Sequence, residues 1–165
     1  MRREPLKIKT FFTAFCAISI FASAVSAQET EISRRDVPPA VLSAFSKDYP
    51  NAKVLEWEKE IQGGTLYYEA ETVDGKLARN IMYSPDGSTA QVEEKVAPKD
   101  LPQTVTDAVK QQYPNATVRS ANKVTHLDVT EYSLSMSGSA PSKLVLSSDG
   151  TIVSKEGKKA LDRNQ

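Results

Sequence analysis

The sequence predicts an α+β protein made of two tandem repeats, each with one helix followed by a four-stranded antiparallel sheet. The first observation is a duplication: segment 38–54 recurs at 102–118, with eight of 17 positions identical at an offset of 64. Ordinary residue frequencies would give roughly one match. The second is that each copy opens with an amphipathic pattern closed by a Tyr-Pro pair. Segments of alternating apolar and polar residues then follow, as expected for strands.

Residues 1–27 are predicted to be an export signal. A basic start is followed by the uncharged apolar run 11–25, which is shorter than the ~20 residues of a membrane span. Val25-Ser26-Ala27 is typical of a signal cleavage site. Cleavage after Ala27 would remove Cys16, the only cysteine, and leave a net charge of −3. We therefore expect a periplasmic or secreted protein with no integral membrane segment after cleavage.

Composition excludes several classes of function. The chain has 165 residues with 21 basic and 21 acidic ones, so no basic field indicates a nucleic-acid partner. Hydrophobic and charged fractions of 39% and 25% are those of a globular protein. No phosphate-binding glycine pattern or nucleophile elbow occurs. We expect no catalytic residue, no metal ligand set and no cofactor.

The first repeat, residues 37–96, is expected to open with a helix. Pro38 and Pro39 suit a first helical turn, and Asp36 is placed to cap it. Pro50 ends the helix, because a residue before proline avoids the α region. The apolar residues at spacings of three and four form one face, namely Val41, Leu42, Phe45 and Tyr49.

Four strands are expected to follow this helix. Their turns are marked by Gly63-Gly64, Asp74-Gly75 and Asp86-Gly87. The predicted strands are 53–61, 66–73, 77–83 and 89–96. Alternation places Leu55, Trp57 and Ile61 on one face of the first strand, and Glu56, Glu58 and Glu60 on the other.

The second repeat, residues 101–156, is expected to have the same plan. Its predicted strands are 117–124, 129–136, 143–146 and 151–155. Residues 28–36 and 97–100 are interpreted as linkers, and 157–165 as a flexible tail. Because a ~60-residue domain is marginal alone, the two units are expected to share one sheet or to pack together.

These residues together resemble the PepSY-like family, which is also described as β-lactamase-inhibitor-like. The matching residues are Val37-Pro38, Val41, Phe45, Tyr49-Pro50, Ala52, Trp57, Tyr67-Tyr68, Ile81, Tyr83-Ser84 and Asp86-Gly87. The second repeat departs from the pattern, since nothing matches Trp57 and residues 135–142 replace the Asp-Gly hairpin. The resemblance implies small exported proteins related to modules that bind or inhibit periplasmic enzymes, and it implies no reaction.

The sequence favours a non-catalytic protein that binds a periplasmic or secreted protein or peptide through the open face of its sheet. Tyr67 and Tyr68 point to opposite faces of a strand, so one of them is expected to be exposed. Carboxylates provide the other candidate contacts. The predicted binding residues are Tyr67, Tyr68, Glu56, Glu58 and Glu69.

Three alternatives remain open at this stage. The glutamates of the first repeat could bind a cation or small ligand, or could form a solvated outer face with Lys53, Lys59 and Arg79 nearby. A hydrolase would have to use His126, the single histidine, which we interpret as an exposed strand or loop residue.

Overall fold

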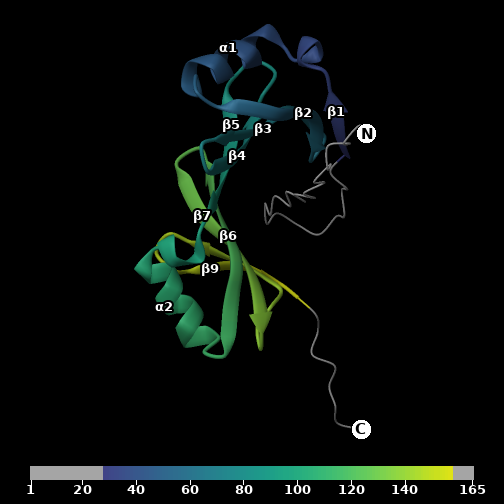
Figure 1. Cartoon of the computed structure of the whole chain (residues 1–165). Coiled ribbons are helices and arrows are strands. Elements are labelled where there is room, and N and C mark those ends of the chain that lie inside the picture. Colours follow the sequence, from purple (N-terminus) through teal and green to yellow (C-terminus); the bar gives the residue numbers. More distant parts are fainter. Residues whose placement is uncertain (1–27, 158–165) are drawn as a thin grey trace, which may run out of the picture.

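The computed structural model describes residues 28–157, in which one long antiparallel sheet carries two helices (Figure 1). The elements in chain order are β1 (Gln28–Ile32), the 3-10 helix η1 (Arg34–Asp36), α1 (Pro39–Asp48), β2 (Lys53–Gln62), β3 (Thr65–Asp74), β4 (Leu77–Tyr83), β5 (Thr89–Val96), the 3-10 helix η2 (Pro98–Asp100), α2 (Gln103–Gln112), β6 (Ala116–His126), β7 (Val129–Gly138), β8 (Lys143–Ser147) and β9 (Ile152–Glu156).

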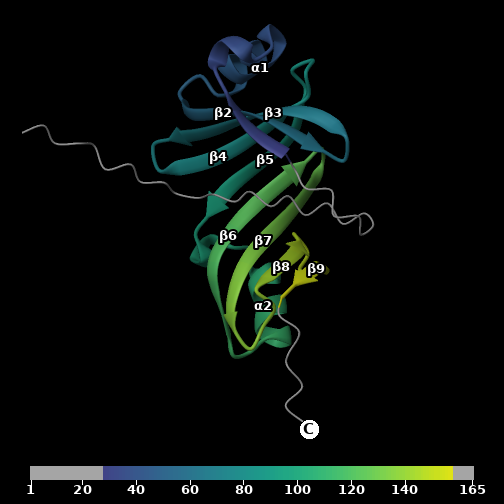
Figure 2. The same cartoon turned by 90° about the vertical axis from the view of Figure 1, so that its right-hand side faces the viewer.

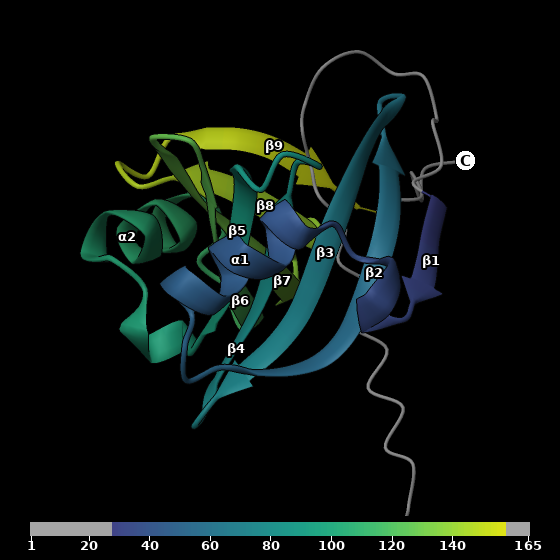
Figure 3. The same ribbon diagram turned by 90° about the horizontal axis from the view of Figure 1, so that it is seen from above.

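The strands of both repeats form a single sheet rather than two. Its order is β1 to β9 without a crossover, and every neighbouring pair is antiparallel. β5 joins the repeats by pairing with β6, from Val92 opposite Thr125 to Val96 opposite Ala121. Because the sheet is continuous through this junction, α1 and α2 both cover the same face (Figure 1, Figure 3).

The predicted N-terminal linker contains a strand that the sequence analysis did not predict. β1 pairs with β2, and Ile32 lies opposite Trp57. Val96 of β5 lies opposite Ala121 of β6, which is the same register shifted by 64 residues. β1 is therefore placed beside β2 in the same way as β5 is placed beside β6. The structural unit begins one strand earlier than predicted, and β5 is shared by the first unit (β1–β5) and the second unit (β5–β9).

The predicted cap of the first helix is wrong. Asp36 lies in η1, where its backbone N–H donates to the Ser33 carbonyl oxygen at 2.9 Å. Pro38 is the N-terminal boundary residue of α1, and no side-chain hydrogen bond caps the helix. The first intrahelical bond instead runs from the Leu42 N–H to the Pro38 carbonyl oxygen. Two consecutive prolines supply the fixed backbone angle and carry no N–H to satisfy.

Aromatic residues dominate the core of the first unit. Phe45 of α1 meets Trp57 edge to face, with ring centroids 5.5 Å apart, and stacks on Tyr49. Leu55 and Ile61 were expected beside Trp57, but they are 54% and 42% exposed. A β-bulge between Val54 and Glu56 breaks the alternation at Leu55. The core also contains Val37, Val41, Tyr68, Ala70, Ile81 and Tyr83.

The second unit fills the same space with different residues. Ala121 and Val109 stand where the first unit has Trp57 and Phe45. Leu134 and Met136, at the positions of Ala70 and Thr72, are larger and offset part of this loss of volume. The other buried members of this core are Leu101, Val105, Leu144 and Leu146. Each unit thus has its own core beneath its own helix.

Two hairpin turns contact the helices closely, and each does so at a glycine. Gly87 has φ +88° and Gly150 has φ +89°. A Cβ on Gly87 would lie 2.7 Å from the Ala40 carbonyl oxygen, and one on Gly150 would lie 2.6 Å from the Thr104 carbonyl oxygen. These contacts explain why the Asp-Gly pair recurs in both repeats.

We predict that Gly87→Ala lowers the free energy of unfolding by about 2–4 kcal/mol, since it combines backbone strain with a clash. Gly75→Ala is the matched control, because φ is +60° and nothing lies within 4 Å of its Cβ. Its expected loss is about 1 kcal/mol. Urea denaturation measures both values, and equal losses would contradict the proposed clash with α1.

Candidate functional site

The sheet face opposite the helices carries a concentration of glutamates in the first unit. In Figure 2 this open face turns toward the reader over β6 and β7, with α2 behind the sheet. Strand register assigns the glutamates to one face. We call them the acidic surface, which consists of Glu29, Glu31, Glu56, Glu58, Glu60, Glu69 and Glu71.

The glutamates of the acidic surface lie directly opposite one another. Glu58 stands between Glu31 on β1 and Glu69 on β3, and Glu56 stands opposite Glu71. Like charges in such cross-strand positions destabilise a sheet. Opposed glutamates nevertheless occur along three adjacent strands, β1, β2 and β3. Because this arrangement lowers the stability of the sheet, we regard the acidic surface as the leading candidate site.

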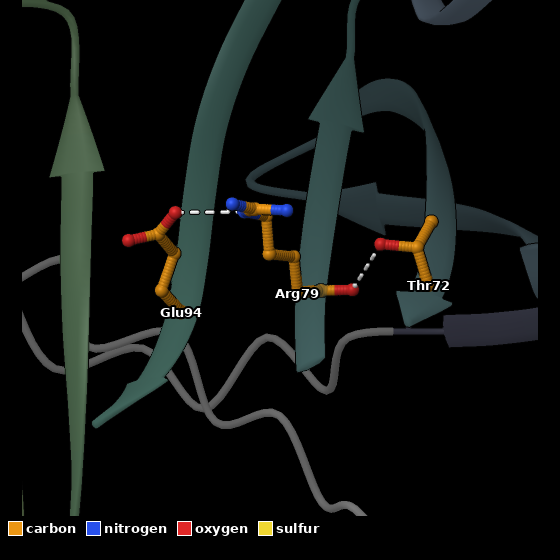
Figure 4. A network of polar contacts seen from close by, with 3 residues as sticks. All are labelled: Thr72, Arg79 and Glu94. Carbon is orange, nitrogen blue, oxygen red and sulfur yellow. Dashed lines mark hydrogen bonds and ion pairs between the residues drawn. The ribbon is translucent and has the colours of Figure 1, made fainter. Parts of the chain in front are cut away.

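Two cationic side chains that are close to these glutamates in the sequence lie on the other face of the sheet. Lys59 lies over the Tyr68 ring, 5.9 Å from its centroid. Arg79 forms an ion pair with Glu94, with 2.7 Å between Nε and Oε1 (Figure 4). Strand alternation therefore separates both cations from the acidic surface, although Lys59 is a sequence neighbour of Glu58 and Glu60.

Burial and mutual repulsion raise the pKa values of the central carboxyls. Glu69 is 6% exposed, and the Asn80 amide donates to its Oε1 at 2.7 Å. Desolvation, followed by the charges of Glu60 and Glu58, raises the pKa of Glu69 to about 8. Desolvation and the charge of Glu56 raise the pKa of Glu58 to about 7. The surface therefore changes charge near neutral pH.

The two candidate tyrosines have different environments. Tyr68 packs into the core beneath α1, so it lies on the face of the sheet opposite the acidic surface. Tyr67 is partly exposed and lies opposite Glu60 on the open face. Trp57 is a core residue, as its alternation predicted.

The open face of the second unit has polar residues where the first unit has its paired glutamates. Ser120 and Asn122 occupy the positions of Glu56 and Glu58, and Ser133 and Ser135 occupy those of Glu69 and Glu71. The acidic surface is therefore a property of the first unit alone.

A buried carboxylate at the junction of the units was missed by the sequence analysis. Glu93 is 8% exposed and accepts a hydrogen bond from the Asn122 amide at 2.5 Å. Desolvation raises its pKa, while this hydrogen bond and Lys143 oppose the shift. The two residues meet only because β5 pairs with β6, and no local sequence signal indicates that pairing.

The remaining chemical candidates are dispersed. His126 is an exposed residue at the end of β6. Among residues 28–157, no group of three or more His, Cys, Asp or Glu side chains is arranged to hold a metal ion. Within the same range, no helix is long and apolar enough to cross a bilayer.

Comparison with known families now defines the relationship of the chain. A family described as β-lactamase-inhibitor-like and PepSY-like matches residues 23–67 and 66–154. The chain belongs to this PepSY-like family. The two matched segments meet at residues 66–67, at the start of β3 within the first unit, so their boundary differs from that of the two structural units. No protein of curated function matches the sequence.

Solved structures share the fold of this PepSY-like chain at low sequence identity. A BLIP-like protein from Bacteroides fragilis is 21% identical, covers 76% of this chain and 89% of its own, and has a TM-score of 0.58. A DUF2874 family protein from Bacteroides ovatus is 22% identical, with coverages of 72% and 86% and a TM-score of 0.60. A third, from Bacteroides eggerthii and described as periplasmic, is 16% identical, with coverages of 73% and 88% and a TM-score of 0.59.

We predict that the folded chain loses stability as pH rises from 5 to 8.5. A carboxyl whose pKa is raised by folding stabilises the fold fully below its unfolded pKa, about 4.3, and this contribution disappears as pH rises through the folded value. For Glu58 and Glu69 the loss therefore extends to about pH 7 and about pH 8.

Melting temperatures of wild type and Glu69→Gln at pH 5 and pH 8.5 test this dependence. The variant should melt higher than wild type at pH 8.5 and show a smaller difference at pH 5. Asp128→Asn, in the exposed turn between β6 and β7, is the control and should leave the pH dependence unchanged. A wild type equally stable at both pH values would contradict the assignment.

Proposed function

We propose that this protein is an exported, non-catalytic binding protein whose acidic surface binds a basic segment of a periplasmic or secreted partner protein. The observation that carries the proposal is the direct cross-strand opposition of glutamates on β1, β2 and β3. A row of lysine or arginine side chains would relieve this repulsion, so the charge arrangement favours a cationic partner.

The surface also has features of a protein contact rather than a solvated face. Tyr67 offers a partly exposed aromatic ring among the carboxylates, and aromatic residues are enriched at binding hot spots. The carboxylates come from strands of a hydrogen-bonded sheet, which holds them in fixed positions. The BLIP-like name of one structural neighbour supports a protein partner by analogy of fold only.

Binding and protonation should oppose each other on this surface. Glu58 and Glu69 are partly or largely protonated near neutral pH, and a cationic partner favours their charged form. The partner should therefore bind more tightly at pH 8.5 than at pH 6. Added salt should weaken the complex, because part of the surface is exposed.

Export is the remaining part of the proposal. The predicted signal peptide, residues 1–27, lies outside the residues that the structure describes. All the described strands, from β1 (Gln28–Ile32) to β9, follow the predicted cleavage point. Processing after Ala27 would therefore leave all nine strands intact.

The test compares three forms of the chain 28–165 on a column with periplasmic extract and with a synthetic lysine-rich peptide. Wild type should retain both the peptide and a stoichiometric partner protein. The triple variant Glu56→Gln, Glu58→Gln, Glu69→Gln should lose both, with binding weakened by about tenfold or more. The matched control Asp128→Asn, Glu131→Gln removes acidic charge from the second unit and should bind as wild type does.

Circular dichroism establishes that each variant is folded before binding is compared. A partner that the folded triple variant retains at wild-type affinity would contradict a role for the acidic surface. Loss of the partner from the second-unit control alone would place the binding surface on the second unit and would also contradict the proposal.

A further inference from the structure

The two units differ in what covers the tyrosine at the end of each helix. In the first unit the guanidinium of Arg79 lies over the Tyr49 ring, 5.7 Å from its centroid. Glu94 holds this guanidinium at 2.7 Å, and the Arg79 carbonyl oxygen accepts a bond from the Thr72 hydroxyl at 3.1 Å (Figure 4). An ion pair thus fills the space beside Tyr49.

The second unit has lost this ion pair. In the second unit, Ser142 occupies the position of Arg79, and Gly157 occupies that of Glu94. This alignment follows from strand register, because Leu144 pairs with Lys155 as Ile81 pairs with Val92. The Met136 N–H donates to the Ser142 carbonyl oxygen at 2.8 Å, which fixes this alignment on the β7 side. A hydroxyl and a glycine therefore replace a guanidinium and a carboxylate.

A pocket of about 900 Å³ lies where the ion pair is missing. Its size is within the range of small-molecule sites, roughly 300–1,000 Å³. Apolar groups from α2, β7 and the β7–β8 loop line much of it, namely Tyr113, Met136, Ala140 and Pro141. The first unit shows that a side chain can fill this position, because Arg79 fills it there.

One cation faces this apolar lining. Lys155 pairs with the buried Leu144, so it projects from β9 on the helix side, and its ammonium lies 5.9 Å from the Tyr113 ring centroid. Glu156 also lines the pocket at its rim, and its pairing with Lys143 directs its side chain toward the opposite face of the sheet. On the helix side, the pocket thus combines apolar side chains with the Lys155 ammonium.

We propose that this pocket binds a small apolar molecule that ends in a carboxylate, with the carboxylate on Lys155 and the apolar body against Tyr113 and Met136. An apolar body matches the lining, and an anion matches the ammonium that lies over the Tyr113 ring. The site is separate from the acidic surface, which lies on the other face and in the other unit.

Calorimetric titration of the chain 28–165 with octanoate tests the proposal, and octylammonium is the opposite-charge probe. Octanoate should bind saturably and octylammonium should not. Lys155→Met should weaken octanoate binding by about tenfold or more, because a charge-assisted contact is lost. Lys59→Met is the matched control, since Lys59 lies at the same 5.9 Å from a tyrosine ring in the first unit, and it should bind as wild type does.

A second variant tests the pocket independently of charge. Ser142→Met places a neutral, flexible side chain where the first unit has Arg79, and it should abolish octanoate binding while circular dichroism stays unchanged. Full octanoate binding by folded Ser142→Met or Lys155→Met would overturn the proposal, as would equal binding of octylammonium. Binding that appears only in a chain shortened to end at Gly157 would also overturn it, because residues 158–165 would then be the natural occupant.

Discussion

The antiparallel pairing of β5 with β6 determines most other features of this molecule. A unit of about 60 residues buries too little surface to be robust alone, and this pairing merges two such units into one sheet. Val92 and Val96 are four residues apart on β5 and point to the same face, where Val92 packs against the first core and Val96 against the second. Both helices consequently lie on one face, and the other face is left without a helix.

The shared strand also explains the number of strands. Each unit contains a strand, a 3-10 helix, an α-helix and four further strands, and β5 serves as the last strand of one unit and the first of the next. β1 and β9 are the two ends of this arrangement, each with one neighbour in the sheet. Edge strands are the places where a sheet can add further chains, so short edges limit self-association.

The duplication conserved the skeleton and diversified the surfaces. Val41 and Val105 are fully buried at the same place in α1 and α2, and Gly87 and Gly150 occupy the same turn with positive φ. Two positions that differ in charge are that of Glu58, where the second unit has Asn122, and that of Arg79, where it has Ser142. With these differences the first unit has a charged face and the second unit a pocket, so the two units are alike in fold and different in chemistry.

Local chemistry made much of the fold predictable from the sequence. The Tyr-Pro pairs and Asp-Gly turns placed both helices and their strands within one or two residues, because proline and glycine act through the backbone where they stand. β1 escaped prediction, since its stability comes from pairing with a strand 25 to 33 residues away. Alternation placed Leu55 on the face of Trp57, because the sequence pattern gives no sign of the bulge between Val54 and Glu56.

The candidate site was predictable only in part, for the same physical reason. Alternation placed Glu56, Glu58 and Glu60 on one face, but only the register could set Glu69 opposite Glu58 and separate Lys59 from both. The sequence showed that Tyr67 and Tyr68 point to opposite faces of a strand. It could not show which of the two is buried, because that depends on which face α1 covers. Glu93 and Asn122 meet across the junction of the units, where no local pattern applies.

Urea unfolding followed with two probes is the most direct test of a sheet shared through β5. Trp57, the only tryptophan, reports on the first unit by its fluorescence, and far-ultraviolet circular dichroism reports on both units. A single sheet predicts one cooperative transition with the same midpoint for both probes. A second transition that is visible by circular dichroism and silent in Trp57 fluorescence would show that the units unfold independently and would contradict a shared strand.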